Sequence, residues 1–173
     1  DQAYGIHQVE LRYEIWSEIH VSHVELGLEQ PEQTGLSWNG EPVEIKETGW
    51  YADRRIKTTG LGELKKGRNE LKIVREFHEK ANLEALYLLG DFGVRVQGRR
   101  AVVTEPVREL DFGDWTDQGL PFYGGNVTYH LKLTAEREGE QAGIQISNFT
   151  VPVIRADLDG KKQWLIAFSP YRL

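Results

Sequence analysis

The sequence predicts an all-β protein built as an antiparallel β-sandwich. Its 18 glycines and 6 prolines divide the chain into short segments. Many of these segments alternate apolar with polar residues, which is typical of strands with one buried and one solvent-facing side. Strands and helices do not alternate regularly along the chain, so a parallel α/β sheet is not expected. With 173 residues, the chain can bury one full core or two thin ones.

The N-terminal half contains the first predicted strands and a hairpin. Residues 9–15 place apolar side chains at every second position between charged ones, and residues 21–29 repeat this pattern. Both segments therefore predict strands with one wet face. Asn39-Gly40 predicts a type I′ turn because both residue types readily adopt positive φ angles, and Asp159-Gly160 predicts a second turn of the same chemistry.

The C-terminal half continues this style. Residues 126–134 form the clearest predicted strand of the chain, with Val127, Tyr129, Leu131 and Leu133 alternating against polar residues. Further predicted strands occupy residues 144–146, 151–153 and 164–168.

Two features of the pattern bear on the core. Residues 70–89 fit both a helical and a strand spacing. We favour two strands that separate near Lys80-Ala81-Asn82, with a helix as the alternative. Trp38 is expected to pack across strands beside its hairpin turn, whereas Trp16 and Trp164 lie in strand-like patterns and are expected in the core.

Composition and charge exclude several classes of function. The chain has 21 Lys and Arg against 27 Asp and Glu, a net charge of −6, which argues against a nucleic acid partner. No apolar run approaches the roughly 20 residues of a membrane helix, so no membrane partner is expected. The absence of cysteine excludes disulfides, a zinc ribbon and thiol catalysis. The absence of methionine suggests a domain excised from a longer protein; the compartment is left undetermined.

The two halves of the sequence show a weak internal similarity in the order of their strands and turns. We therefore expect a first β-sandwich repeat in residues 1–90 and a second in residues 91–173 that lacks its last strand. The alternative is one merged domain that spans residues 1–173.

Several motifs together resemble a known family. The segments Trp38-Asn39-Gly40, Trp50-Tyr51-Ala52-Asp53 and Lys65–Leu71 resemble the sugar-binding, galactose-binding-like jelly-roll domain of glycoside hydrolase family two. The segments Leu83–Val94 and Gly113–Gly125 are similar to C-terminal β-sandwich regions of large bacterial glycoside hydrolases, including α-L-rhamnosidase-like proteins. This resemblance, which spans nearly the whole chain, implies a jelly roll that binds carbohydrate or supports a catalytic barrel. It implies no catalysis by this domain itself.

Two loops combine aromatic side chains with polar groups, as a carbohydrate site requires. The first contains Trp50, Tyr51, Asp53 and Arg54. Adjacent Trp50 and Tyr51 cannot both face the core of an extended segment, so one of them should be presented outward. The structural alternative is that Trp50 caps the end of the sandwich and Tyr51 bonds a backbone carbonyl.

The second loop contains Trp115 and Tyr123, which either line a cleft or fold back on the core. From both loops we predict a non-catalytic carbohydrate-binding accessory domain from a larger glycoside hydrolase, with carbohydrate and the catalytic domain of the parent polypeptide as partners. The alternative is a structural β-sandwich scaffold that docks against the catalytic domain without binding sugar.

Catalytic and metal sites are not predicted. Asp111 with Asp114 or Glu109 could form a carboxylate pair, but nothing in their spacing singles them out as a glycosidase pair. No cofactor is predicted. A structural calcium ion is left open at the acidic turn Asp157–Gly160, because calcium prefers oxygen ligands; the alternative there is an ordinary hairpin turn.

Overall fold

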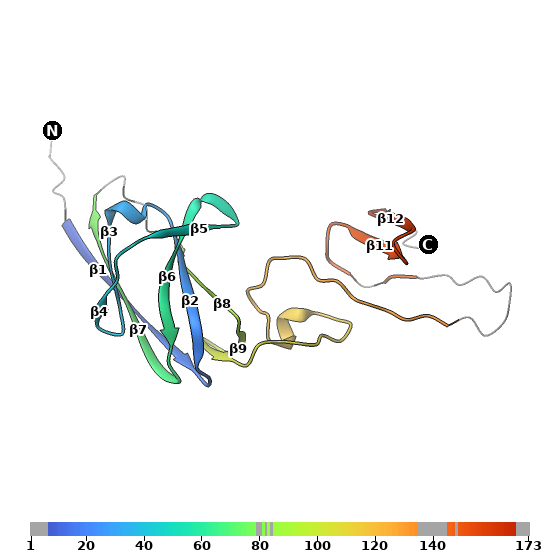
Figure 1. Ribbon diagram of the computed structural model, residues 1–173, viewed down its shortest axis with the longest axis horizontal. Helices are drawn as coiled ribbons and strands as arrows, with labels where there is room; N and C mark the ends of the chain where they lie inside the picture. Colours follow the sequence, from blue (N-terminus) through green and yellow to red (C-terminus); the bar gives the residue numbers. More distant parts are fainter. Residues whose placement is uncertain are drawn as a thin grey trace. The chain divides into compact units, whose positions relative to one another are not determined.

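The computed structural model describes residues 7–78, 81, 83, 85–134, 145–147 and 149–168. The chain divides into two compact units, Asp1–Gly125 and Asn126–Leu173 (Figure 1). The regular structure in the described residues is β, apart from two short 3-10 helices, η1 (Pro31–Gln33) and η2 (Trp115–Gln118). Among these residues, neither helical segment has the length or apolar character to span a bilayer.

The first unit is a sandwich of two sheets. One sheet has six strands in the order β4-β3-β7-β1-β10-β9, and the other has four in the order β5-β6-β2-β8. All pairs are antiparallel except β1 with β10. The prediction of an all-β sandwich is confirmed, and its strands are mostly antiparallel. The strand bounds are β1 (His7–Ser17), β2 (Val21–Leu28), β3 (Thr34–Trp38), β4 (Glu41–Pro42), β5 (Glu47–Tyr51), β6 (Asp53–Leu64), β7 (Gly67–Phe77), β8 (Tyr87–Gly90), β9 (Gly93–Gln97) and β10 (Arg100–Thr104).

The core of this unit lies between the two sheets and follows the alternation of the sequence. In β2, Val24, Leu26 and Leu28 are buried, and they pack with buried residues of the opposite sheet. Burying one such side chain contributes about 1.5–3 kcal/mol. The buried cluster consists of Val21, Val24, Leu26, Leu28, Leu36, Trp38, Leu61, Leu64, Leu71, Ile73 and Val103.

The turn predictions hold in both units. Asn39 and Gly40 have φ angles of 52° and 88° between β3 and β4, and both positive values are those a type I′ turn requires. The same geometry recurs at Asp159 and Gly160. The ambiguous segment 70–89 is two strands, as favoured, because β7 ends at Phe77 and β8 begins at Tyr87.

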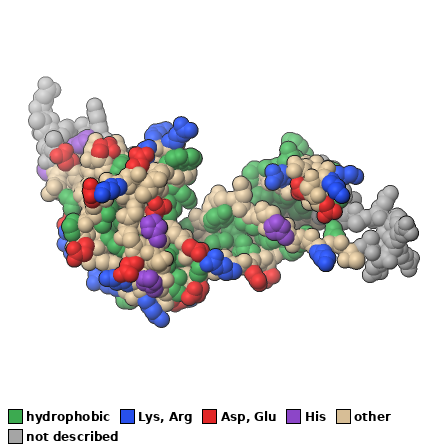
Figure 2. All heavy atoms as spheres, in the orientation of Figure 1, with side chains coloured by type: hydrophobic (Ala, Val, Ile, Leu, Met, Phe, Trp, Pro, Cys, Tyr) green, Lys and Arg blue, Asp and Glu red, His purple; other side chains and the backbone are tan. Residues whose placement is uncertain are grey.

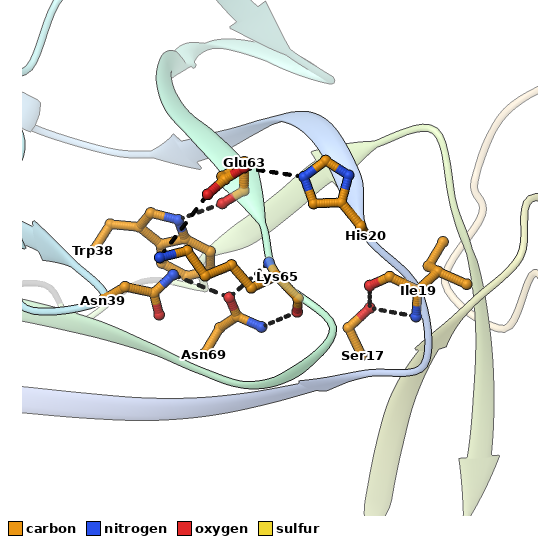
Figure 3. Close-up of polar contacts among 8 residues, drawn as sticks. All are labelled: Ser17, Ile19, His20, Trp38, Asn39, Glu63, Lys65 and Asn69. Carbon is orange, nitrogen blue, oxygen red and sulfur yellow. Dashed lines mark hydrogen bonds and ion pairs between the residues drawn. The ribbon is translucent and has the colours of Figure 1, made fainter.

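A polar network joins the hairpins at one end of the sandwich (Figure 3). The Trp38 indole N–H donates to the carbonyl of Glu63 at 2.9 Å, so this tryptophan packs in the core with its polar atom satisfied. The amide of Asn69, 1% exposed, accepts from the Lys65 N–H and from Asn39 Nδ2 at 3.0 Å each, and donates to the Lys65 carbonyl at 2.7 Å. These bonds fix the β6–β7 turn against the β3–β4 turn.

Two tryptophans expected in the core are outside it. Trp16 is 52% exposed and Trp164 is 37% exposed. In β1 the alternation that places Ile15 against the core and buries Ser17 turns Trp16 to the opposite face of the sheet. The expectation for Trp16 was wrong because this residue is out of phase with the apolar positions that precede it.

The second unit contains one two-stranded sheet in its described part, formed by β11 (Ile154–Leu158) and β12 (Lys162–Ile166). Residues 126–134 belong to no strand, so that prediction was wrong. Side-chain alternation shows which residues would share a face, but a strand also requires a neighbouring strand for its hydrogen bonds. Residues 151–153 are likewise not a strand, and Ile144 lies outside the described residues.

Strands β9 and β10 extend the sheet that contains β1, which is why the first compact unit continues beyond Gly90 to Gly125. The proposed repeats in residues 1–90 and 91–173, and the alternative of one merged domain, stay predictions.

Candidate functional site

The first predicted group of site residues lies at the tip of the β5–β6 hairpin. A single residue, Ala52, links the two strands and adopts a positive φ of 57°. Asp53 accepts a hydrogen bond from the backbone N–H of Arg55 at 2.8 Å, which fixes its carboxylate at the turn. Trp50, Tyr51, Asp53 and Arg54 are therefore gathered on one tight hairpin, where hydrophobic and basic side chains lie together (Figure 2).

Trp50 is the most exposed aromatic residue among the predicted residues of this hairpin. Its side chain is 56% exposed, and its cross-strand partner is Lys57. Lys57 donates to Glu47 at 2.6 Å, so an ammonium–carboxylate pair lies next to the indole. Asp53 and Arg54 are both exposed on the other side of the turn. The Lys57–Glu47 pair therefore supplies a hydrogen-bond donor and an acceptor beside the indole.

Tyr51 has different surroundings from Trp50. Its ring packs against Tyr87, with ring centroids 5.1 Å apart and planes inclined by 51°. Tyr87 lies opposite Gly27 in the register of β2 and β8. A β-bulge between Trp50 and Tyr51 accompanies this change of environment, and Tyr51 covers the outer face of the four-stranded sheet.

A polar cluster continues along this outer face. The Thr48 hydroxyl donates to Glu25 Oε1 at 2.7 Å and lies 2.8 Å from the Thr58 hydroxyl. The sequence reasoning missed Tyr87 and this cluster. The alternation of residues 21–29 could have placed Glu25 on the wet face, but the partners come from other strands and only the strand register brings them together.

The second predicted group lies in and after η2. Trp115 is half-buried at the start of this helix, whereas Tyr123 is 46% exposed. The most exposed aromatic residues of the segment are Phe112 and Phe122, at 71% and 70%. This region therefore presents phenylalanines, which have no polar atom, rather than the indole of Trp115.

The helix η2 begins with a capping interaction. Asp114 accepts from the backbone N–H of Thr116 at 2.9 Å and from its hydroxyl at 2.7 Å. These bonds stabilise the carboxylate and lower the pKa of Asp114 below its usual value. A glycosidase general acid needs a raised pKa instead, so Asp114 does not have the electrostatics of that role.

One internal cavity is too small for a sugar. It is lined by residues including Leu28, Ile73 and Arg75 and has a volume of about 10 Å³, which accommodates about one water molecule. The exposed residues of the candidate site lie on the surface instead.

The carboxylate of Asp157 stabilises the turn between β11 and β12 in the second unit. Asp157 accepts from the Gly160 N–H at 2.7 Å and from Gln163 Nε2 at 2.8 Å, so both carboxylate oxygens are engaged. Across the described part of the chain, no group of three or more His, Asp or Glu side chains is arranged to hold a metal ion.

No family model, curated protein or solved structure matches the chain. The resemblance to the galactose-binding-like domains of glycoside hydrolases stays a prediction, and the functional conclusion depends on the geometry of the residues themselves.

Proposed function

We propose that the chain is a non-catalytic carbohydrate-binding module of the galactose-binding-like, jelly-roll kind, and an accessory domain of a larger glycoside hydrolase. Sugars present an apolar C–H face together with a rim of hydroxyl groups. A site for them combines an aromatic face with planar or charged hydrogen-bonding groups.

The observation that supports this proposal most is the environment of Trp50. Its indole is 56% exposed on the β5–β6 hairpin, and Trp50 is not one of the residues of the buried core. The Lys57–Glu47 pair on one side and the side chains of Asp53 and Arg54 beyond the turn supply donors and acceptors for hydroxyl groups. The arrangement suits a pyranose ring that stacks on the indole.

The proposal assigns binding and not hydrolysis to this chain. Hydrogen bonds that they accept lower the pKa of Glu10, Glu18 and Asp114, whereas a glycosidase general acid needs a raised pKa. Hydrolysis would then belong to the catalytic domain of the parent polypeptide, which we propose as the second partner.

A scaffold that binds no sugar is the second candidate function. It is favoured by the exposed aromatic side chains of Phe112, Phe122 and Tyr123, because exposed aromatic residues also mark protein interfaces. In this alternative these residues dock on the catalytic domain, and Trp115 and Tyr123 support the interface instead of a second sugar site.

The test is a broad glycan array with the purified chain, Trp50→Ala and Trp115→Ala. We expect the wild-type chain to bind a specific glycan, Trp50→Ala to weaken binding about tenfold, and Trp115→Ala to leave it nearly unchanged because Trp115 is half-buried. Silence of the folded wild-type chain across plant, microbial and mucin glycans would refute sugar binding and favour the scaffold.

A further inference from the structure

Trp16 is a second exposed indole, on strand β1 of the first unit and far along the chain from Trp50. It lies on the outer face of the six-stranded sheet, since its neighbours Ile15 and Ser17 are directed to the core side. Its cross-strand partners are Arg68 on β7 and Val102 on β10. Strands β7 and β10 flank β1 on both sides, yet the indole is 52% exposed. Part of its apolar surface is therefore in contact with water.

Two arginines, each paired with one or two carboxylates, border this indole. Arg68 contacts Glu14 at 2.6 Å and Glu70 at 3.4 Å. On the other side, Arg95 makes two hydrogen bonds to the carboxylate of Glu18, at 2.5 and 3.3 Å.

The pairing of Arg95 with Glu18 is also reflected in their titration. The hydrogen bond from Arg95 lowers the pKa of Glu18, and the same bond raises the pKa of Arg95. Both of these groups therefore stay charged near neutral pH. The two arginines and their glutamates place planar donors and acceptors at the edges of an apolar ring.

The charges around Trp16 indicate which class of ligand this surface could bind. Each guanidinium already faces at least one carboxylate, so the patch has no excess positive charge to attract a phosphate or a uronate. An uncharged molecule with an apolar face and many hydroxyl groups fits better, because hydroxyls can both donate to the carboxylates and accept from the guanidinium groups.

We infer that the outer face of the six-stranded sheet at Trp16 is a second carbohydrate-binding surface, for an uncharged pyranose, with Arg68 and Arg95 as its polar borders. The inference rests on the proposed function for its ligand class, carbohydrate. It assigns a different binding surface, at Trp16 and not at Trp50. Trp16 and Trp50 belong to strands of different sheets, so one molecule would hold two glycan segments and gain avidity from both.

The test is affinity electrophoresis of the full chain through gels that contain galactomannan, arabinoxylan, laminarin or the acidic polygalacturonate. Trp16→Ala, Trp50→Ala and the double variant are compared with the wild-type chain. Trp164→Ala, which removes a partly exposed indole from the second unit, is the matched control. We expect each single variant at Trp16 or Trp50 to weaken retardation by the same neutral polysaccharide about three- to tenfold. The double variant should abolish it, and the control should migrate as the wild type does.

The outcomes separate the two proposals. If Trp50→Ala loses retardation and Trp16→Ala keeps it, the second surface is refuted and the proposed function stands. If the wild-type chain is not retarded by any polysaccharide, both are refuted. If retardation that depends on Trp16 occurs only with polygalacturonate, the assignment to uncharged sugars is refuted. Circular dichroism and thermal unfolding check the fold of each variant, and a half-exposed side chain should change the midpoint only slightly.

Discussion

Segments 21–28 and 126–134 have similar alternating patterns and opposite outcomes. In the first unit, residues 21–28 form β2, which has β6 on one side and β8 on the other. In the second unit, residues 126–134 belong to no strand. Leu26 is 1% exposed, whereas Leu131 and Leu133 are 57% and 59% exposed. Alternation therefore buries a face only where neighbouring strands and an opposing sheet are present to cover it.

The largest expected difference between the units is the loss in free energy of unfolding when a leucine is replaced by alanine. Leu64 is fully buried between the sheets, so Leu64→Ala should lower the free energy of unfolding by about 3 kcal/mol through lost burial and a cavity. Leu131→Ala, at an exposed position of the second unit, should change it by less than about 0.5 kcal/mol. Urea denaturation followed by circular dichroism measures both, and equal costs would contradict the difference between the two segments.

The next effect concerns polar side chains. Asn69 is buried and joins two turns of the first unit, so Asn69→Ala should cost about 2 kcal/mol, since its partners lose their hydrogen bonds in a buried site. Gln163→Ala removes one exposed bond to Asp157 in the second unit and should cost less than about 0.5 kcal/mol. The same denaturation experiment applies, and a stable Asn69→Ala variant would show that the network is dispensable.

A smaller difference is expected between alanine substitutions in the two hairpin turns. Gly40 and Gly160 both have positive φ, so alanine at either position should strain its turn by about 1 kcal/mol. Gly40→Ala should lower the stability of the whole first unit, because β3 is part of its sheet. Gly160→Ala should only increase amide exchange in β11 and β12. Hydrogen exchange resolves the two responses; global loss of protection from Gly160→Ala would mean that the hairpin stabilises more than its own unit.

The smallest expected effect is the pH dependence of the η2 cap. The folded pKa of Asp114 is lowered by its bonds from Thr116, so its contribution is fully present above the unfolded pKa and is lost as pH falls through the folded pKa. The Thr116 amide resonance should shift with the Asp114 carboxyl in an acid titration by NMR. In Asp114→Asn that titration step should disappear, and a midpoint above the usual value for aspartate would contradict the cap.

Much of the first unit could be predicted because its strands and turns follow from patterns in adjacent residues. The alternation of residues 9–15 and 21–29 and the turn chemistry of Asn39-Gly40 are properties of a few adjacent residues. The exposure of Trp16 was also encoded there, since Trp16 is out of phase with Val9, Leu11 and Ile15. The expectation was wrong because it used the strand-like pattern without the phase of this residue.

What could not be predicted depends on contacts between distant segments. Trp50 and Tyr51 were expected in a loop, whereas they end β5 of the β5–β6 hairpin. The packing of Tyr51 on Tyr87 follows from the register of β2 with β8 and of β5 with β6. The failure at residues 126–134 has the same origin, because a short sequence pattern does not specify which strand, if any, will lie beside it.

The parallel contact between β1 and β10 has a consequence for the synthesis of the protein. Among the described strands of this unit, β1 is synthesised before the others, and it lies inside the six-stranded sheet with β7 on one side and β10 on the other. One edge of β1 must stay unpaired until β10, the last strand of the unit, has been translated, which takes several seconds at ordinary elongation rates. A nascent chain with that edge open can pair with other chains. Synthesis of this domain therefore includes an interval in which protection of β1 by a chaperone would raise the yield of folded protein.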